Sequence, residues 1–461
     1  MKKKISQDKL WGNAFSVAPD DKMLQFTVGH DAYGIEPADQ MLLKYDIQCN
    51  LAQAKMLLAQ KLLTENEFNK LETGLLELSQ LVAQGKFILN PALEDMHSNI
   101  ENWLTEKYGI EIGGKIHTGR SRNDQVVTDL FLFVHDQLNF FQKTISTLNQ
   151  AVLEQAKKYQ NTVCPGYTHH QHAVVTSFGY ILHAFYVSFK RDLLGLKQLQ
   201  EKFDYSPLGA SVGYGTLIPI DPEKSAEQLG FSKPFANAID VITNRGELEA
   251  EFAFQLVKFL NHCSTLAESL ILFSMPEFGF IKLADQYSTG SSAMPQKKNP
   301  DPLELIKGKS KSALGYLFTL LNLTNSALIG YNRDTQESKY AIYHLVNNVK
   351  LIPEILQGVV STLTVNKVAM KVQANSAFIN SMGLMELIML QSKLPMRQVK
   401  QIIEKAIKAS VAKGEQNKVL YAEFIKIVKS DNLAIKISKQ EFAQFQDANF
   451  QLKILQKQFN F

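Results

Sequence analysis

Apolar residues recur every three or four positions through the middle of this chain of 461 residues. Between Arg120 and Cys164 there is neither Gly nor Pro, so nothing in the sequence interrupts a helix there. The apolar positions of this stretch share one helical face: Leu130, Val134, Leu138, Phe141, Ile145, Leu148, Val152, Ala156 and Tyr159. Three further segments, 176–203, 247–275 and 303–328, also resemble long helices. The pattern therefore predicts an elongated helical bundle.

The first of these predicted helices is apolar on more than one face. Phe131, Phe133, Phe140 and Phe141 occupy different sides of it. Such wide coverage indicates burial on several sides, either within one bundle or against partner subunits. We favour a homo-oligomer, and a fully internal helix is the alternative.

Shorter elements flank the predicted bundle. Residues 54–87 indicate a pair of helices before it, and residues 394–410 indicate a short helix that begins near Pro395. The strand signal is weak, and the stretch 215–221 is its candidate. The fold class is therefore predicted to be mainly α.

Composition narrows the range of partners. A net charge of +4 is too small for its length to indicate nucleic acid or an acidic membrane surface. The cysteines Cys49, Cys164 and Cys263 are few and widely spaced, which fits a reducing compartment without disulfides or a thiolate metal site. No signal-peptide core follows the basic N-terminus, and no apolar run approaches the ~18 residues of a membrane helix. We expect a cytoplasmic protein.

Polar segments interrupt the apolar pattern. In residues 93–104, Asp95 and His97 stand at a predicted helix start, where helix capping is the simpler interpretation. Residues 113–126 combine three glycines with three basic residues directly before the longest predicted helix. Such a loop can bind an anion at the helix N-terminus, and Arg122 would add a fork suited to carboxylate. A solvated loop with a helix cap is equally compatible with this pattern.

A third polar segment, 166–180, contains three histidines, His169, His170 and His172. Their spacing does not match a zinc motif, and no matching Cys or carboxylate accompanies them. A single histidine beside Thr168, acting as an acid, a base or an orienting charge, is the favoured interpretation.

The fourth polar segment, 288–309, places Ser291, Lys297 and Asn299 in a Gly- and Ser-containing loop before a predicted helix. We interpret it as a mobile catalytic loop that removes a proton next to a carboxylate. Further along, residues 330–340 mix aromatic, amide and cationic groups, which is compatible with a binding role. The alternative interpretation is that this segment is the polar start of a helix. The side chains concerned are Tyr331, Arg333, Gln336 and Lys339.

Taken together, these segments resemble the fumarase/aspartase superfamily. Residues 290–301, GSSAMPQKKNPD, match its signature G-S-S-x-M-P-x-K-x-N at every fixed position. Within the superfamily the chain resembles the argininosuccinate lyases. That likeness is carried by residues 9–15, 94–101, 117–130, 207–221, 294–305 and 331–339. It covers about residues 9–365 and becomes faint in the last hundred.

The resemblance implies a three-domain, mainly α fold with boundaries at 1–116, 117–365 and 366–461. It implies a homotetramer whose active sites combine loops from three subunits. The implied reaction is the reversible cleavage of argininosuccinate to arginine and fumarate, a step of arginine biosynthesis that needs no cofactor and no metal.

Residue roles also follow from the resemblance. Ser291 is the implied general base and His169 the proton donor at the leaving nitrogen, although the two roles could be exchanged. Lys297 and Asn299 would stabilise the aci-carboxylate charge, and Glu304 could orient His169. The implied substrate-binding and supporting residues are Ser121, Arg122, Asn123, Thr168, Tyr331, Gln336, Lys339, Asp95 and His97.

Some positions depart from the family pattern. Val174 and Val175 follow the catalytic histidine where other residues are usual, and Ile35 takes the place of a substrate-binding serine within an apparent insertion, 32–38. The alternatives are a sister lyase acting on adenylosuccinate, malate or aspartate, and a non-catalytic, crystallin-like homologue. The QKKN and GRSRNDQ sequences argue against the first, and the complete catalytic set argues against the second.

Overall fold

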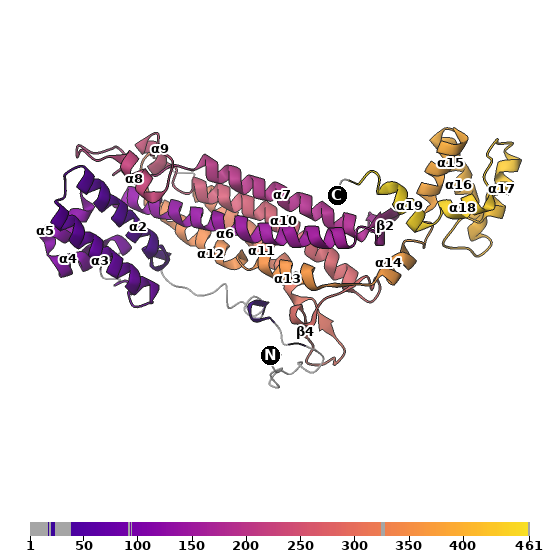
Figure 1. Cartoon of the computed structure of the whole chain (residues 1–461), viewed down its shortest axis with the longest axis horizontal. Helices are drawn as coiled ribbons and strands as arrows, with labels where there is room; N and C mark the ends of the chain where they lie inside the picture. The colour runs from indigo at the N-terminus through magenta and orange to yellow at the C-terminus, as the bar shows by residue number, and fades with distance from the viewer. Residues whose placement is uncertain are drawn as a thin grey trace.

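The computed structural model forms a long helical body with a bundle in its middle and a smaller group of helices at each end (Figure 1). The residues that it describes are 17, 20–23, 38–90, 93, 95–323 and 328–459. The mainly α prediction is therefore confirmed. Residues 9–15 and the Ile35 position lie outside the described residues. No helix in the described ranges is long and apolar enough to cross a membrane.

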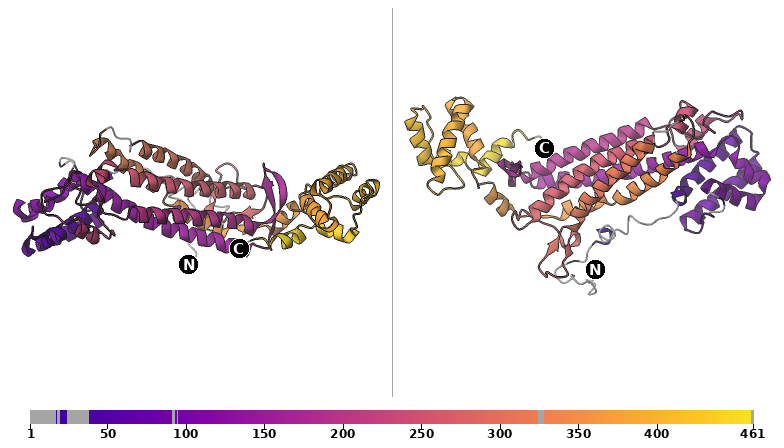
Figure 2. Two further views of the ribbon diagram at one scale, coloured as in Figure 1. Left: turned by 90° about the horizontal axis from the view of Figure 1, so that it is seen from above. Right: turned by 180° about the vertical axis from the view of Figure 1, so that it is seen from behind.

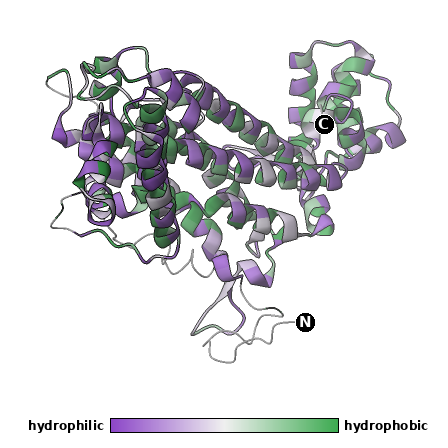
Figure 3. Ribbon diagram, turned by 60° about the vertical axis from the view of Figure 1, so that its left-hand side comes forward, coloured by the Kyte–Doolittle hydropathy of each residue, from purple (hydrophilic) through white to green (hydrophobic). Residues whose placement is uncertain are grey.

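The central bundle contains the four long helices that the sequence predicts. It consists of α6 (Arg122–Lys158), α7 (Phe178–Lys202), α10 (Glu247–Ser274), α11 (Asp301–Leu323), α12 (Glu337–Val349) and α13 (Ile352–Thr362). The predicted apolar stripe of α6 is buried along its whole length. Phe131 and Phe133 are also buried within the chain itself, whereas Phe140 is exposed. Figure 3 shows the resulting division of the helices into hydrophobic and hydrophilic sides.

Local sequence explains where α6 begins and ends. Ser121 is its N-cap, and Asp124 completes a capping box by accepting a hydrogen bond from the Ser121 backbone N–H. Lys157 and Lys158 lie in the last turn, where cations favour the helix dipole. The 37 residues of α6 span about 55 Å, so this helix runs from the N-terminal group of helices to the far end of the bundle.

The N-terminal group of helices lies at one end of the bundle (Figures 1 and 2). It contains α2 (Ala38–Ala59), α3 (Glu65–Ala83), α4 (Met96–Tyr108), α5 (Ile110–Gly113) and the 3-10 helix η3 (Gly114–His117). The helical pair predicted for residues 54–87 corresponds to α2 and α3, but α2 begins earlier, at Ala38. Two short helices pack near this end, α8 (Pro222–Leu229) and α9 (Ala238–Thr243).

A β-hairpin, which the sequence analysis missed, follows α6 at the other end of the bundle. Strand β1 (Val163–Thr168) pairs antiparallel with β2 (Gln171–Ser177), and Cys164 lies opposite Thr176. His169 and His170 form its two-residue turn, with φ angles of 52° and 60°. Positive φ at both turn residues is the type I′ geometry that matches strand twist.

The strand predicted for residues 215–221 is wrong. Gly215 forms an isolated bridge with Ser211, and no strand follows it in this described segment. Pro219 removes a backbone donor, and the positive φ of Gly215 turns the chain away from an extended path. The remaining strands are short pairs: β3 (Ile281–Lys282) with β6 (Thr364–Val365), and β4 (Thr289–Gly290) with β5 (Lys298–Asn299).

The C-terminal group of helices has an apolar cluster of its own, which includes Leu384, Ile402 and Phe424. It comprises α14 (Lys367–Gln373), α15 (Ser381–Ser392), α16 (Met396–Val411), α17 (Tyr421–Ser430), α18 (Lys439–Phe445) and α19 (Ala448–Leu455). Helix α16 starts directly after Pro395, as predicted. Val175 of the hairpin packs with Leu452, so this group is also attached to β2.

Candidate active site

A polar pocket of about 590 Å³ lies where the N-terminal helices meet the bundle. Three sequence segments that are distant along the chain, around residues 95, 122 and 336, converge there. The pocket brings together seven of the predicted substrate-binding and supporting residues. These are Asp95, His97, Arg122, Asn123, Tyr331, Gln336 and Lys339.

Helix starts position one wall of the pocket. Asp95 is the N-cap of α4 and accepts a hydrogen bond from the Ser98 backbone N–H at 2.8 Å. The other carboxylate oxygen of Asp95 pairs with Arg122 Nη1 at 3.1 Å, and Arg122 Nη2 donates to Ser98 Oγ at 2.8 Å. The Ser121 hydroxyl accepts from the Asn123 N–H at the start of α6. Capping and pocket formation therefore use the same residues.

The opposite wall comes from the start of α12 and the preceding 3-10 helix η5 (Arg333–Gln336). Gln336 Nε2 donates to the Tyr331 hydroxyl oxygen at 2.6 Å. Lys339 lies one turn further and pairs with Asp39 of α2 at 2.6 Å. The predicted shared face of Gln336 and Lys339 is thus the face that lines the pocket.

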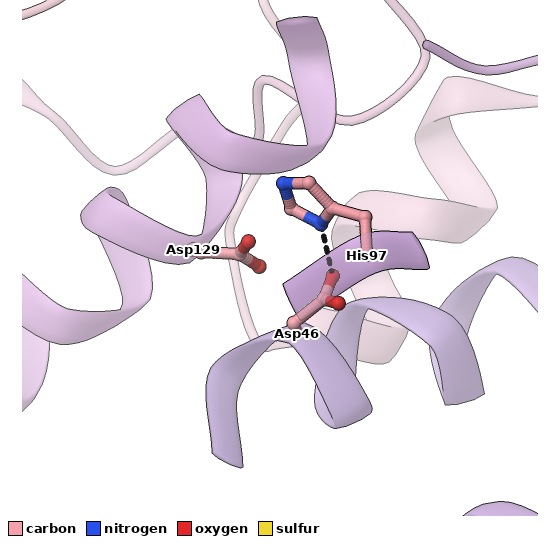
Figure 4. A group of neighbouring side chains, drawn as sticks. All are labelled: Asp46, His97 and Asp129. Atoms are coloured by element: carbon pink, nitrogen blue, oxygen red, sulfur yellow. Dashed lines mark ion pairs between the residues drawn. The ribbon is translucent and has the colours of Figure 1, made fainter. Parts of the chain in front are cut away.

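A buried charge cluster of Asp46, His97 and Asp129 adjoins the pocket through His97 (Figure 4). His97 Nδ1 lies 3.1 Å from Asp46 Oδ1, and both Asp46 and Asp129 are completely buried. Gln125 donates to Asp46, and Arg120 donates to Asn50. His97 lines the pocket, so the cluster fixes the position of a pocket side chain.

The pKa values of the two buried carboxyl groups of this cluster are shifted in opposite directions. Burial raises the pKa of Asp129 well above its ordinary value, and the nearby Asp46 charge raises it further. Burial would also raise the pKa of Asp46, but His97 and Arg120 outweigh it, and that pKa is lowered. Asp46 is therefore the more acidic of the two carboxyl groups, and Asp129 holds its proton more strongly.

Among the described residues, this is also the cluster whose side chains lie close enough together to hold a metal ion. Single ligand atoms of Asp46, His97 and Asp129 lie within 4.8 Å of one another. Carboxylate and imidazole are ligand types that zinc accepts. A cation would, however, compete with Arg120, whose positive charge already acts on both carboxyl groups. The site chemistry derived below uses no metal.

Sequence reasoning did not single out Asp46, Asp129 or Arg120 as a buried cluster. Asp46 and Asp129 lie on the buried sides of α2 and α6. A lone carboxylate on the apolar side of a helix is itself an indication of a buried partner. His117, also near this cluster, has a pKa lowered to about 4 by burial and by the neighbouring Arg120, His97 and Arg122 charges.

Thr168 and His169 lie far from the pocket within one chain. Both are exposed at the tip of the β1–β2 hairpin. The pocket is at the N-terminal end of α6 and the hairpin follows its C-terminal end, so the length of that helix separates them by roughly 50 Å. Figure 2 shows the two regions at opposite ends of the bundle.

The predicted catalytic loop projects from the bundle between β4 and β5 (Figure 1). Ser291 Oγ accepts hydrogen bonds from the backbone N–H groups of Ala293 and Met294, at 3.3 and 3.1 Å. Asn299 Nδ2 donates to the Gly290 carbonyl at 3.2 Å. Lys297 is exposed in this loop.

Glu304 lies in the first turn of α11 and is exposed. No hydrogen bond or ion pair joins Glu304 to His169 within the described chain. A single chain thus presents three separate groups of predicted residues: the pocket, the hairpin tip and the loop.

The chain is similar in sequence to known lyases. The profile of a protein family described as Lyase matches residues 5–315. "Argininosuccinate lyase" of Bacillus anthracis is 37% identical over 88% of this chain and 86% of that protein. "Argininosuccinate lyase 2" of Shouchella clausii has the same identity and coverage.

Solved structures share the fold. EDDS lyase in complex with formate aligns with a TM-score of 0.83 and 25% identity, over 96% of this chain and 87% of that chain. Fumarate lyase from Mesorhizobium sp. BNC1 aligns with a TM-score of 0.74 over 95% of this chain and 97% of that one. At 15% identity, the second likeness concerns the fold alone.

Proposed function

The chain belongs to the argininosuccinate lyase family of the fumarase/aspartase superfamily, and from that premise we propose that it cleaves argininosuccinate reversibly to L-arginine and fumarate. The observation that carries this proposal is the 37% identity to argininosuccinate lyases over most of both chains. It is a carbon–nitrogen lyase, and we assign it to arginine biosynthesis.

The charges of the pocket suit this substrate. Argininosuccinate carries several carboxylates together with an amino group and a guanidinium group. For the carboxylates, the pocket offers the cations Arg122, Arg333 and Lys339. For the amino and guanidinium groups, it offers the anions Asp39 and Glu337. The planar fork of Arg122 can bind a carboxylate through two parallel hydrogen bonds. Ser121, Asn123 and Thr168 would complete the binding of the fumarate-side carboxylates.

The proposed reaction begins when Ser291 removes a proton from the carbon next to a carboxylate. A serine hydroxyl is a very weak acid, so its alkoxide needs strong stabilisation. The two backbone N–H groups that meet Ser291 Oγ would supply part of it. Lys297 and Asn299 would stabilise the negative charge that develops on the aci-carboxylate.

His169 would then transfer a proton to the leaving guanidinium nitrogen as the carbon–nitrogen bond breaks, with Glu304 orienting its ring. The roles of Ser291 and His169 as base and acid could be exchanged. Tyr331, Gln336, Lys339, Asp95 and His97 would hold the rest of the substrate. No step of this scheme uses a metal or an organic cofactor.

A homotetramer with shared active sites would bring these groups together. Since roughly 50 Å of α6 separates the pocket from the hairpin tip, one chain cannot assemble the full set of residues. Large apolar side chains are exposed on the bundle helices and could form the subunit contacts. Among them are Leu194, Phe254, Leu314, Phe318 and Leu321, each more than half exposed.

Two further expectations remain proposals. The three described cysteines are free and buried, which is compatible with a cytoplasmic location. The division into domains at 1–116, 117–365 and 366–461 is retained, with the second apolar cluster in support of a separate C-terminal unit.

The proposal is tested by mixing the purified protein with argininosuccinate and following fumarate by its ultraviolet absorbance. Adenylosuccinate, malate and aspartate are assayed in parallel. We expect fumarate from argininosuccinate alone. Fumarate from another of these substrates would move the protein to a sister lyase family. A folded tetramer that releases fumarate from none of them would contradict the proposed activity.

A further inference from the structure

A buried arginine stands behind the pocket wall that Tyr331 and Gln336 form. Arg245 precedes α10 directly before its N-cap Gly246, and only 2% of the residue is exposed. Its Nη2 atom donates a hydrogen bond to Gln336 Oε1 at 3.3 Å. Arg245 is not among the residues that line the pocket. It can therefore act on a bound molecule only through its neighbours.

Glu249, one turn into α10, is the buried acidic neighbour of Arg245. Burial raises the pKa of Glu249, and the Arg245 charge opposes this rise. Glu249 also accepts a hydrogen bond from Ser338 Oγ, at 3.4 Å. The two charged groups partly compensate each other, which allows a guanidinium group to remain in this dry position.

The chemistry of the guanidinium group fixes the direction of the hydrogen bonds. Guanidinium can only donate, so the Gln336 amide must turn its oxygen toward Arg245. Gln336 Nε2 then faces the Tyr331 hydroxyl oxygen, 2.6 Å away, and donates to it. Arg245 also forms a side-chain hydrogen bond with Tyr331. Because the Tyr331 oxygen already accepts from these neighbours, its hydroxyl proton is available for an acceptor in another direction. Tyr331 lines the pocket, where such an acceptor could bind.

We propose that Arg245 is a positioning residue that fixes the Gln336 amide and thereby directs the Tyr331 hydroxyl as a hydrogen-bond donor to a carboxylate of the bound substrate. This inference rests on the proposed function, because argininosuccinate supplies the carboxylate. A hydroxyl donor and a buried cation behind the wall favour an anionic acceptor over a neutral one.

Stability alone does not account for Arg245. Its Nε and Nη1 atoms are buried without a hydrogen-bond partner among the described residues. A buried ion pair can often be replaced by apolar residues without loss of stability. A guanidinium group that contacts both Gln336 and Tyr331 is therefore better explained by what it does to these two pocket residues.

The test removes the buried pair and keeps the pocket residues. The double variant Arg245→Met/Glu249→Met should fold and assemble as the parent protein does, which circular dichroism and light scattering would verify. We expect KM for argininosuccinate to rise roughly tenfold, with a much smaller change in kcat. The single variant Glu249→Gln retains Arg245 and serves as the matched control, with KM near that of the parent.

A mutant cycle separates positioning from a general structural effect. If Arg245 acts through the Tyr331 hydroxyl, adding the Arg245/Glu249 changes to Tyr331→Phe should raise KM no further, because that variant lacks the oxygen that Gln336 and Arg245 both contact. Independent, multiplying effects on KM would overturn the proposal. So would an unchanged KM in a well-folded Arg245→Met/Glu249→Met protein.

Product binding distinguishes failure of this inference from failure of the proposed function. Calorimetric titration with fumarate and, separately, with L-arginine needs no turnover. We expect Kd for one of the two to rise roughly tenfold in the double variant, which would also identify the carboxylate concerned. Unchanged Kd values for both products would overturn the role of Arg245, whereas an inactive parent protein that still binds them would overturn only the proposed reaction.

Discussion

Ser291 stands where two backbone N–H groups, those of Ala293 and Met294, converge on one hydroxyl oxygen. This geometry favours negative charge on the oxygen, as a general base requires. The surrounding loop is exposed, so the side chain contributes little to packing. Chemistry and stability can therefore be separated at this residue.

The change Ser291→Ala should lower turnover at least a thousandfold and leave the assembly intact, because it removes the proposed base without creating a cavity. Fumarate absorbance measures the rate, and light scattering measures the mass of the assembly. Ser292→Ala, one position further in the same loop, is the control and should retain most activity. Nearly normal turnover, or a mass that differs from the mass of the parent protein's assembly, would contradict this role.

His117 should make the protein less stable at mildly acidic pH. Its folded-state pKa is lowered to about 4 by burial and nearby cations, below the ordinary value of about 6.5. The unfolded chain therefore binds more protons between these values, and stability is lost as pH falls through this window. Because His117 is partly exposed, the expected loss in the free energy of unfolding at pH 5 is about 1 kcal/mol.

The variant His117→Gln should lose less stability than the parent between pH 7 and pH 5. Thermal unfolding at a series of pH values measures this difference. Above pH 7 the imidazole is neutral in both states, so the gap between the two proteins should be constant there. An equal loss of stability in both proteins on acidification would show that His117 does not contribute.

Motifs identified the pocket residues, whereas the residues that support them were not found. Tyr331, Gln336 and Lys339 belong to a short, unusual polar segment, which a single pass along the sequence detects. Asp46 and Arg245 stand alone among ordinary neighbours, and their partners lie about fifty to ninety positions away. Only the folded chain shows such pairings, because they depend on how helices pack rather than on local sequence.

At the scale of elements, helices were predictable and the hairpin was not. Helical spacing continues over whole segments, so α6, α7, α10 and α11 were found to within a few residues. Strands β1 and β2 are short, and Pro165, Gly166 and the two turn histidines mask their alternation. The I′ turn at His169 and His170 also lacks the usual Asn-Gly or Gly-Gly signal.

Two glycines of α7 test how closely it packs on its neighbours. A Cβ atom at Gly179 would clash with the backbone of Ala156 in α6 and of Gln160 just after that helix. Gly179→Ala should therefore destabilise the protein by about 1–3 kcal/mol, because the two backbones would have to move apart. Chemical or thermal denaturation measures the loss.

Gly195→Ala, in the same helix, is the control for Gly179→Ala. A Cβ atom there would meet the side chain of Gln255, which can move aside. Alanine also favours a helix by about 1 kcal/mol over glycine. This variant should be neutral or slightly more stable. A similar loss of stability at both positions would contradict the close approach proposed for Gly179.

At the scale of the whole molecule, the predicted site residues fall into three separate groups. The pocket, the hairpin tip and the Ser291 loop each have their residues in place, but one chain does not join them. The resemblance implied that each site combines loops from three subunits, but it gave residue roles without the distances between the groups. If subunits pack along the bundle to join these groups, they would cover the apolar side chains that remain exposed on its helices.

Mixing of subunits tests the shared site. Ser291→Ala and Lys339→Met proteins should each be nearly inactive. If these residues reach one site from different subunits, refolding an equal mixture should leave about a quarter of the sites with both native residues. Turnover before and after mixing measures the recovery.

The control for this experiment mixes Ser291→Ala with Lys297→Ala. Both residues lie in one loop, so every site should lack one of them and no activity should return. Absence of recovery in the first mixture, with hybrid assemblies verified by mass, would place Ser291 and Lys339 in the same subunit's site.

The single helix that connects pocket and hairpin also constrains how this gene can change over time. Insertion of one residue into α6 would move the hairpin by about 1.5 Å and rotate it by about 100° relative to Ser121. In a shared assembly that error would be repeated at each position where Thr168 and His169 meet another subunit. Selection would therefore remove insertions and deletions in residues 122–158, even at positions where a change of side chain is tolerated.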